Sequence, residues 1–163
     1  GEANISQFSE KRLRTYLSTL YWKIIEKALD HGLYVVVRPP GVCPGGIKVD
    51  GYYQDYLLKV WDIVSSNTNI KKHSGQVSIE LANEPVNIYD ADSLESARAP
   101  YDFFQPIVDK IRANGFDGII WVPGTGWQSN YTCYKSNPIE GYNIGYAVHA
   151  YVGWYNNLSL IHI

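Results

Sequence analysis

Residues 77–85 read VSIELANEP and combine a strand pattern with a carboxylate at the end of the strand. Apolar side chains recur at every second position from Val77 to Leu81, which is the period of a buried β-strand. Pro85 has no backbone N–H and favours the exit of the chain from a sheet. Glu84 is therefore predicted where a strand becomes a loop, at the edge where catalytic residues gather in parallel β/α folds. The alternative for this motif is a polar strand end followed by a turn proline.

The composition is that of a globular chain with a neutral surface. The 163 residues are enough for one domain with a hydrophobic core, and 45% of them are hydrophobic, including 14 tyrosines and 5 tryptophans. The formal net charge is −2, which argues against electrostatic binding of nucleic acid or of an anionic membrane. No apolar run approaches the roughly 20 residues that span a bilayer. A neutral polymer suits this charge balance better as a partner.

The cysteines and the first residues give weaker information. Residues 1–4 show no signal peptide, and the chain is expected to begin inside a domain. Cys43 and Cys133 fall in predicted loops, where both a disulfide and two free thiols remain open. No Cys-x-x-Cys or clustered His/Cys spacing is present, so we expect no structural zinc and no other metal or organic cofactor.

Helical and strand patterns alternate along the chain. Apolar residues at helical spacing predict a helix from Ser9 to Ala28, with Gly32 in the C-cap position. The short apolar run Leu33–Val37 predicts a strand of a parallel sheet that is covered on both faces, and residues 39–41 (PPG) end it.

The same alternation continues to the end of the chain. It predicts a parallel sheet built from βαβ units, in one domain over residues 1–155 followed by an irregular tail over residues 156–163. The further predicted elements are a helix over 52–64, strand Val77–Asn83, a loop over 90–99 with a break at Pro100, helix Tyr101–Asn114 capped by Gly115, strand Gly118–Pro123, a loop over 124–143 and strand Ile144–Tyr151.

Three strand ends carry residues suited to sugar chemistry: Asn83-Glu84-Pro85, residues 122–127 (VPGTGW) and residues 147–151 (AVHAY). Together with HGLYVVVRPPGVCP at 31–44, ELANEPV at 80–86 and NPIEGYNIGYAVH at 137–149, they follow one another in a family-specific order. From about Leu13 to Trp154 the chain closely resembles glycoside hydrolase family 5, especially the secreted endo-β-1,4-glucanases of gut and rumen bacteria.

The resemblance implies a (β/α)8 barrel and a retaining mechanism. It places the general acid/base at Glu84, whose pKa must be raised for it to protonate the leaving glycosidic oxygen. It places Asn83 against the sugar 2-hydroxyl. His149 and Tyr151 match the family's histidine-x-tyrosine on the sixth strand and are expected to line the substrate site. The alternative for His149 is a hydrogen-bonded core histidine.

Other candidates lie around this predicted site. Trp127 follows a strand in a glycine-rich loop, where a sugar-stacking platform is favoured over core packing. Arg38, at a position where many relatives carry a histidine, is expected to bind substrate. Glu80 is expected to be a barrel-interior carboxylate paired with a cation, with Arg38 as the candidate. The remaining tryptophans in question are Trp61 and Trp121, expected in the core, and Trp154, expected in the cleft or the core.

Half of a barrel is missing from the pattern. A complete (β/α)8 barrel takes about 250 residues, whereas this chain has four recognisable strands, corresponding to the family's third to sixth. The nucleophilic glutamate of the seventh strand has no counterpart, and Glu140, before the last strand, is a poor substitute. Open edges of apolar parallel strands invite pairing, so a homo-oligomer is expected, in which two half-barrels related by a twofold axis give eight strands.

Three functions follow from the sequence. The first is an endo-β-1,4-glucanase-type hydrolase that uses Glu84, with activity weak or lost without a nucleophile. The second is a non-catalytic β-glucan-binding half-barrel that keeps Trp127, Asn83 and His149 as a sugar cleft. The third is a truncation product with no selected function. The partner implied is a β-glucan polysaccharide or oligosaccharide, with no nucleic acid and no membrane, and the location implied is secreted or cell-surface.

Overall fold

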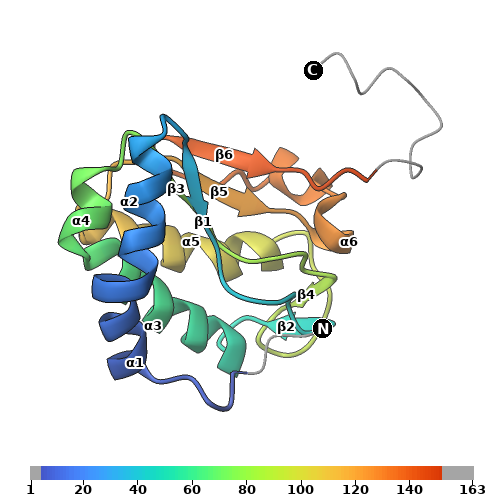
Figure 1. The fold of residues 1–163 in the computed structure, drawn as a ribbon. Helices are drawn as coiled ribbons and strands as arrows, with labels where there is room; N and C mark the ends of the chain where they lie inside the picture. The colour runs from blue at the N-terminus through green and yellow to red at the C-terminus, as the bar shows by residue number, and fades with distance from the viewer. Residues whose placement is uncertain (1–4, 152–163) are drawn as a thin grey trace.

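The sheet is parallel, as the alternation of patterns predicts. The structure, a computed structural model, describes residues 5–151. Its main sheet has four strands in the order β1 (Val35–Val37), β3 (Val77–Glu80), β5 (Ile120–Pro123) and β6 (Ile144–Ala147), all parallel to their neighbours. The strands run side by side with their carboxyl ends toward α6 (Figure 1).

Helices cover one side of this sheet. The predicted first helix is a continuous helical segment with a π-helical turn in its middle, and Ser9 caps its start by accepting a hydrogen bond from the Arg12 amide. The helical elements are α1 (Glu10–Tyr16), η1 (Leu17–Tyr21), α2 (Trp22–Asp30), α3 (Tyr52–Ser66), α4 (Thr68–Lys72), α5 (Ala99–Ala113), α6 (Thr125–Gln128) and the 3-10 turn η2 (Thr132–Lys135).

The hydrophobic core lies between the sheet and helices α3 and α5, which pack against each other. The strand register aligns Ile79, Ile120 and Ile144 on the helix-facing side, and Ile79 and Ile120 are fully buried. Because side chains alternate along a strand, Glu80 and Trp121 face the opposite side.

That opposite side is partly open within residues 5–151. Val36 of β1 is 52% exposed, and Tyr34 just before the strand is 79% exposed. The prediction that this strand is covered on both faces is therefore wrong for the described part of the chain. The physical reason is that α1, α2 and α3 cover only the face to which Val35 and Val37 belong.

Two short strands and a helix start were not predicted correctly. Strands β2 (Gly46–Lys48) and β4 (Asn87–Tyr89) form a separate parallel pair, and each is three residues long, too short for a clear period. Helix α5 begins at Ala99, and Pro100 lies in its first turn, where a missing N–H costs nothing, so the predicted break at this proline is wrong.

The remaining expectations for the fold are settled in part. Strands β3 and β6 end at Glu80 and Ala147, earlier than predicted. Cys43 and Cys133 are free thiols. The predicted tail at 156–163 and Trp154 lie outside the described residues. None of the helices found between residues 5 and 151 has the length and apolar character of a membrane span.

Candidate active site

Glu84 lies just beyond the carboxyl end of β3, where the backbone turns. Beyond the strand the chain stays tied to its neighbours, since the Leu81 amide donates to the Trp121 carbonyl at 3.0 Å and the Cys43 amide donates to the Asn83 carbonyl at 2.8 Å. The next residue, Glu84, adopts a left-handed backbone conformation with φ of 53°. This conformation is uncommon for a residue with a side chain, and it marks a position held by its surroundings.

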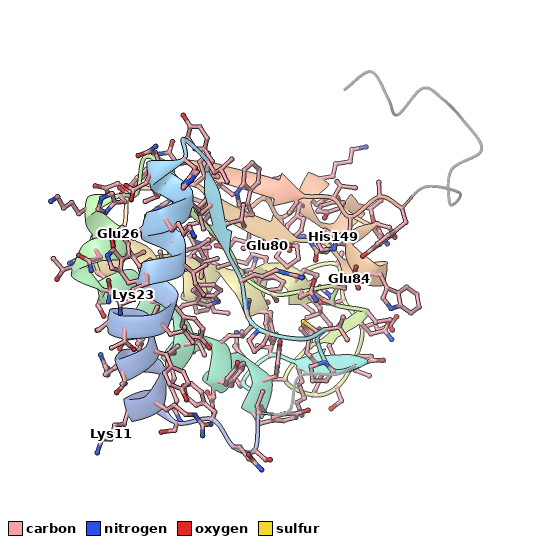
Figure 2. The ribbon with its side chains drawn as sticks, viewed as in Figure 1. Lys11, Lys23, Glu26, Glu80, Glu84 and His149 are labelled. Atoms are coloured by element: carbon pink, nitrogen blue, oxygen red, sulfur yellow. The ribbon has the colours of Figure 1, made fainter. Side chains whose placement is uncertain are left out.

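His149 bridges two carboxylates at this edge. Its Nδ1 lies 3.0 Å from Oε1 of Glu84, and its Nε2 lies 3.0 Å from Oε1 of Glu80. Figure 2 shows these three side chains close together, one from the end of β3, one from the loop after it and one from the chain after β6. The side chains of Glu80, Glu84 and His149 are 10%, 14% and 22% exposed. The cluster is therefore largely shielded from water and still reachable from outside.

The Glu84 carboxylate is stabilised in its ionised form. The hydroxyl group of Tyr151 donates a hydrogen bond to Oε1 of Glu84, and this bond is the main cause of a lowered Glu84 pKa, with His149 adding to it. Partial burial acts in the opposite direction and is outweighed. The expectation of a raised pKa is wrong for this arrangement, because two donors face the carboxylate and no second anion does within residues 5–151.

Arg38 and Asn83 form a pair on the other side of Glu84. The Arg38 guanidinium donates to Oδ1 of Asn83, while Nδ2 of Asn83 donates to the Gly41 carbonyl at 2.6 Å. Asn83 is 6% exposed. The expected pairing of Arg38 with Glu80 is wrong, since Glu80 instead accepts from Gln128 and His149, and Arg38 is used to orient the Asn83 amide.

Trp127 is exposed beside this cluster. Its indole side chain is 52% exposed, and its amide donates to the Pro85 carbonyl at 2.9 Å, which ties the loop after β5 to the loop that follows Glu84. An exposed indole in a loop bonded to the Glu84 loop is compatible with a sugar-stacking platform, and the stacking role stays a prediction. Trp61 is fully buried as predicted. Trp121 is only half-buried and lies on the open face of the sheet, where it bonds Ser78, so its placement in the core is wrong.

Sequence reasoning missed Gln128. This side chain is fully buried, donates to Glu80 at 2.9 Å and accepts from the Glu84 amide at 2.7 Å. The only signal in the sequence is a polar residue directly after the exposed Trp127. That signal is weak, because glutamine is common in loops. The burial of Gln128 depends on a left-handed backbone turn that no sequence pattern predicts.

Glu140 does not belong to this cluster. It precedes β6, at the opposite end of the strand from His149, and its carboxylate accepts from the Tyr101 hydroxyl at 3.3 Å. The cluster therefore holds two carboxylates on the two sides of the His149 ring: Glu84, which also accepts from Tyr151, and Glu80, which also accepts from Gln128. Between residues 5 and 151 no group of three or more His, Cys, Asp or Glu side chains is placed to hold a metal ion.

Comparison with known proteins identifies the family of the chain. Residues 13–159 match the family described as Cellulase (glycosyl hydrolase family 5). The chain belongs to this family. An endoglucanase of Bacillus sp. (strain KSM-635) is 31% identical over 141 residues, which cover 82% of this chain and 14% of that protein. An endoglucanase of Halalkalibacter akibai is 27% identical over 140 residues, which cover 80% of this chain and 17% of that protein. The chain thus spans less than a fifth of these curated relatives.

Solved family 5 structures share the fold. The catalytic domain of Thermobifida fusca endoglucanase Cel5A (E5) superposes with a TM-score of 0.62 at 21% identity, covering 91% of this chain and 47% of that chain. A GH5-4 broad specificity endoglucanase from an uncultured bovine rumen ciliate gives a TM-score of 0.59 at 17% identity, covering 82% and 38%. The match to 47% and 38% of these two chains confirms the prediction of a partial barrel.

Proposed function

We propose that this chain carries the acid/base half of an endo-β-1,4-glucanase site, with Glu84 as the group that exchanges a proton with the glycosidic oxygen. One observation supports this most: a largely shielded carboxylate lies at the carboxyl edge of a parallel sheet, held by His149 and Tyr151, and the neighbouring loop carries the exposed indole of Trp127. Structures of the same fold have been solved with cellopentaose and cellotetraose, which favours a β-1,4-glucan as the ligand.

The lowered pKa of Glu84 sets a condition on this chemistry. A general acid must carry its proton when substrate is bound, and a nearby second carboxylate raises the pKa of the first. Retaining glycosidases place such a carboxylate about 5–5.5 Å away, where it also serves as the nucleophile. Glu80 cannot act as this nucleophile, because its Oε1 atom is bonded to the His149 ring and to the Gln128 amide. The acid function of Glu84 therefore depends on a carboxylate supplied from outside residues 5–151.

The test is the release of reducing ends from carboxymethyl cellulose by the chain and by its Glu84→Gln variant. Glu84→Gln keeps the shape of the side chain and cannot transfer a proton, so hydrolysis should fall by about 100-fold or more. Glu140→Gln is the matched control, because that glutamate is bonded at the opposite end of β6. Loss of activity in both variants, or in neither, would contradict the role given to Glu84.

A second function is favoured by the same absence of a nucleophile between residues 5 and 151. In it, the chain binds β-glucan through Trp127, Asn83 and His149 and releases no product. Calorimetric titration with cellopentaose separates the two: under the binding function, Glu84→Gln leaves affinity nearly unchanged, whereas Trp127→Ala weakens it by about 1–3 kcal/mol, the usual loss on removing one stacking aromatic. No hydrolysis and no binding in the unaltered chain would leave neither function standing.

We further propose that the 163-residue chain pairs with a second copy. The main sheet ends at β1 on one side and at β6 on the other, and a groove of about 680 Å3 runs along the β1 edge, lined largely by apolar side chains of β1 and the first helical segment. A twofold axis parallel to the strands would keep all eight strands parallel and join each β1 to the partner's β6. A monomeric mass by sedimentation at micromolar concentration would refute the pairing.

The proposed substrate also bears on location. Cellulose is too large to enter a cell, so a hydrolase or binder of this polymer acts at the cell surface or in the medium. Immunoblotting of the washed cells, the lysate and the culture medium of the source organism tests this. Detection in the lysate alone would contradict it.

A further inference from the structure

Gln128 is the most deeply buried polar side chain of the site, although it follows an exposed residue. It is 0% exposed, whereas Trp127 is 52% exposed. Both residues adopt the left-handed conformation, with φ of 59° and 56°. Such conformations cost about 1–3 kcal/mol each and persist only where the surroundings fix them. The turn at the end of β5 therefore inserts one particular side chain under the Glu84 cluster.

The Gln128 amide is fully used, and its orientation admits no alternative. Oε1 accepts from the Glu84 amide at 2.7 Å, while Nε2 donates to Oε1 of Glu80 at 2.9 Å and to the Ala147 carbonyl at 3.0 Å. The Glu84 N–H is only a donor, and the other two partners act as acceptors, so a flipped amide would lose all three bonds. One side chain thus connects the end of β3, the loop before Pro85 and the end of β6.

The hydrogen bonds of Gln128 also act on the Glu84 carboxylate indirectly, through Glu80 and His149. Oε1 of Glu80 accepts from Gln128 and also faces Nε2 of His149, so the Nε2 position carries the hydrogen. The other ring nitrogen, Nδ1, then faces Oε1 of Glu84 at 3.0 Å. Nδ1 is therefore the ring atom that forms the hydrogen bond with Glu84, as the acceptor when Glu84 holds a proton and as the donor when the ring carries both hydrogens.

We propose that Gln128 is a positioning residue for Glu84, which fixes the Glu84 backbone directly and, through Glu80, keeps Nδ1 of His149 as the ring atom that bonds Glu84. This proposal rests on the proposed function, because the acid/base role is what makes the proton of Glu84 take part in a reaction. Other titratable or charged groups also act on the cluster: Tyr151 and Arg38 act on Glu84, Glu84 acts on Cys43, and Glu80 acts on Tyr131.

The chain offers a close control in Gln105. This glutamine is also buried, at 8% exposure, and its amide accepts from the Glu140 amide at 2.8 Å. It also donates to a carboxylate, Oδ1 of Asp109, at 2.8 Å and to the Glu140 carbonyl at 3.2 Å. The two glutamines therefore make the same three kinds of hydrogen bond, one at the Glu84 cluster and one at the far end of β6. Comparing them separates anchoring of a loop from positioning of Glu84.

The first experiment uses nitrogen NMR of the histidine rings, with a His149→Gln variant to assign the signals. In the unaltered chain we expect His149 to carry hydrogen on Nε2. Gln128→Glu keeps the size of the side chain and its acceptor for the Glu84 amide but turns an oxygen toward Glu80. We expect this variant to shift both His149 nitrogen signals and Gln105→Glu to leave them in place. Hydrogen on Nδ1 alone in the unaltered chain, or unchanged signals in Gln128→Glu, would overturn the proposal.

A second variant covers the case in which Gln128→Glu fails to fold. Gln128→Met removes the three bonds without adding charge, and we expect hydrogen exchange of the Glu84 amide to quicken about 5- to 10-fold. An unchanged exchange rate would overturn the proposal as well.

If the chain hydrolyses glucan, Gln128→Glu should lower kcat about tenfold or more while KM stays within about twofold, whereas Gln105→Glu should change neither by more than about twofold. If the chain does not hydrolyse glucan, the proposed function fails and the NMR result still decides the role of Gln128. Equal kinetic effects of the two variants would mean that Gln128 only anchors its loop.

Discussion

At the scale of single residues, the hydroxyl group of Tyr151 governs the charge of Glu84. It is the main cause of the lowered Glu84 pKa, so Tyr151→Phe should raise that pKa. A lowered pKa stabilises the fold above the pKa of the unfolded chain, and this stabilisation is lost as pH falls through the folded pKa. In Tyr151→Phe this stabilisation should therefore be smaller, and its loss on acidification should be complete at a higher pH than in the unaltered chain. Carbon NMR of the Glu84 carboxyl group, assigned with Glu84→Gln, measures the shift.

Tyr142→Phe is the control for this prediction, because its hydroxyl also donates to a carboxylate, Oδ1 of Asp117 at 2.8 Å, at the other end of the sheet. That variant should leave the Glu84 titration in place. Identical Glu84 titrations in all three proteins would contradict the assignment to Tyr151.

The same residues show how far the sequence leads. Glu84 and His149 are 65 positions apart, and their meeting could be predicted because both follow strands of one parallel sheet. The lowered pKa of Glu84 and the burial of Gln128 could not be predicted. Both depend on where side-chain donors point after the strands end, and no periodicity in the sequence encodes that direction.

At the scale of elements, β6 packs on β5 through a glycine. The ring of Trp121 covers Gly145 so closely that an added Cβ would lie 2.4 Å from Cζ3. Gly145→Ala must displace this indole, which also donates to Ser78 at 3.1 Å, so we expect a loss of about 1–3 kcal/mol in the free energy of unfolding. Urea denaturation measures it.

Gly75→Ala is the matched control, because nothing lies within 4 Å of a Cβ at that position. It should change stability by less than about 0.5 kcal/mol. A smaller loss in Gly145→Ala than in this control would show that Trp121 moves freely.

Long elements with a regular hydrophobic period, such as α3 and α5, could be predicted from sequence. Strands β2 and β4 could not, since three residues carry no period and their pairing depends on loops far apart in the chain.

At the scale of the whole molecule, the open face of β1 should decide the oligomeric state. Val36 lies on that face with 52% exposure, and pairing with a second copy would bury it inside a closed barrel. A lysine there leaves the isolated fold intact, since the position is exposed, but places a charge in the closed interior, which edge strands use to prevent pairing. We expect Val36→Lys to shift the sedimenting species from dimer to monomer at about 10 μM.

Leu94→Lys tests whether this shift reflects the sheet edge or only added charge. Leu94 is 63% exposed in the loop between β4 and α5, away from β1 and β6, and the same substitution there should leave the dimer in place. Dissociation by both variants would show that the effect is not specific to the β1 edge. A dimer that survives Val36→Lys would assign the contact to another surface.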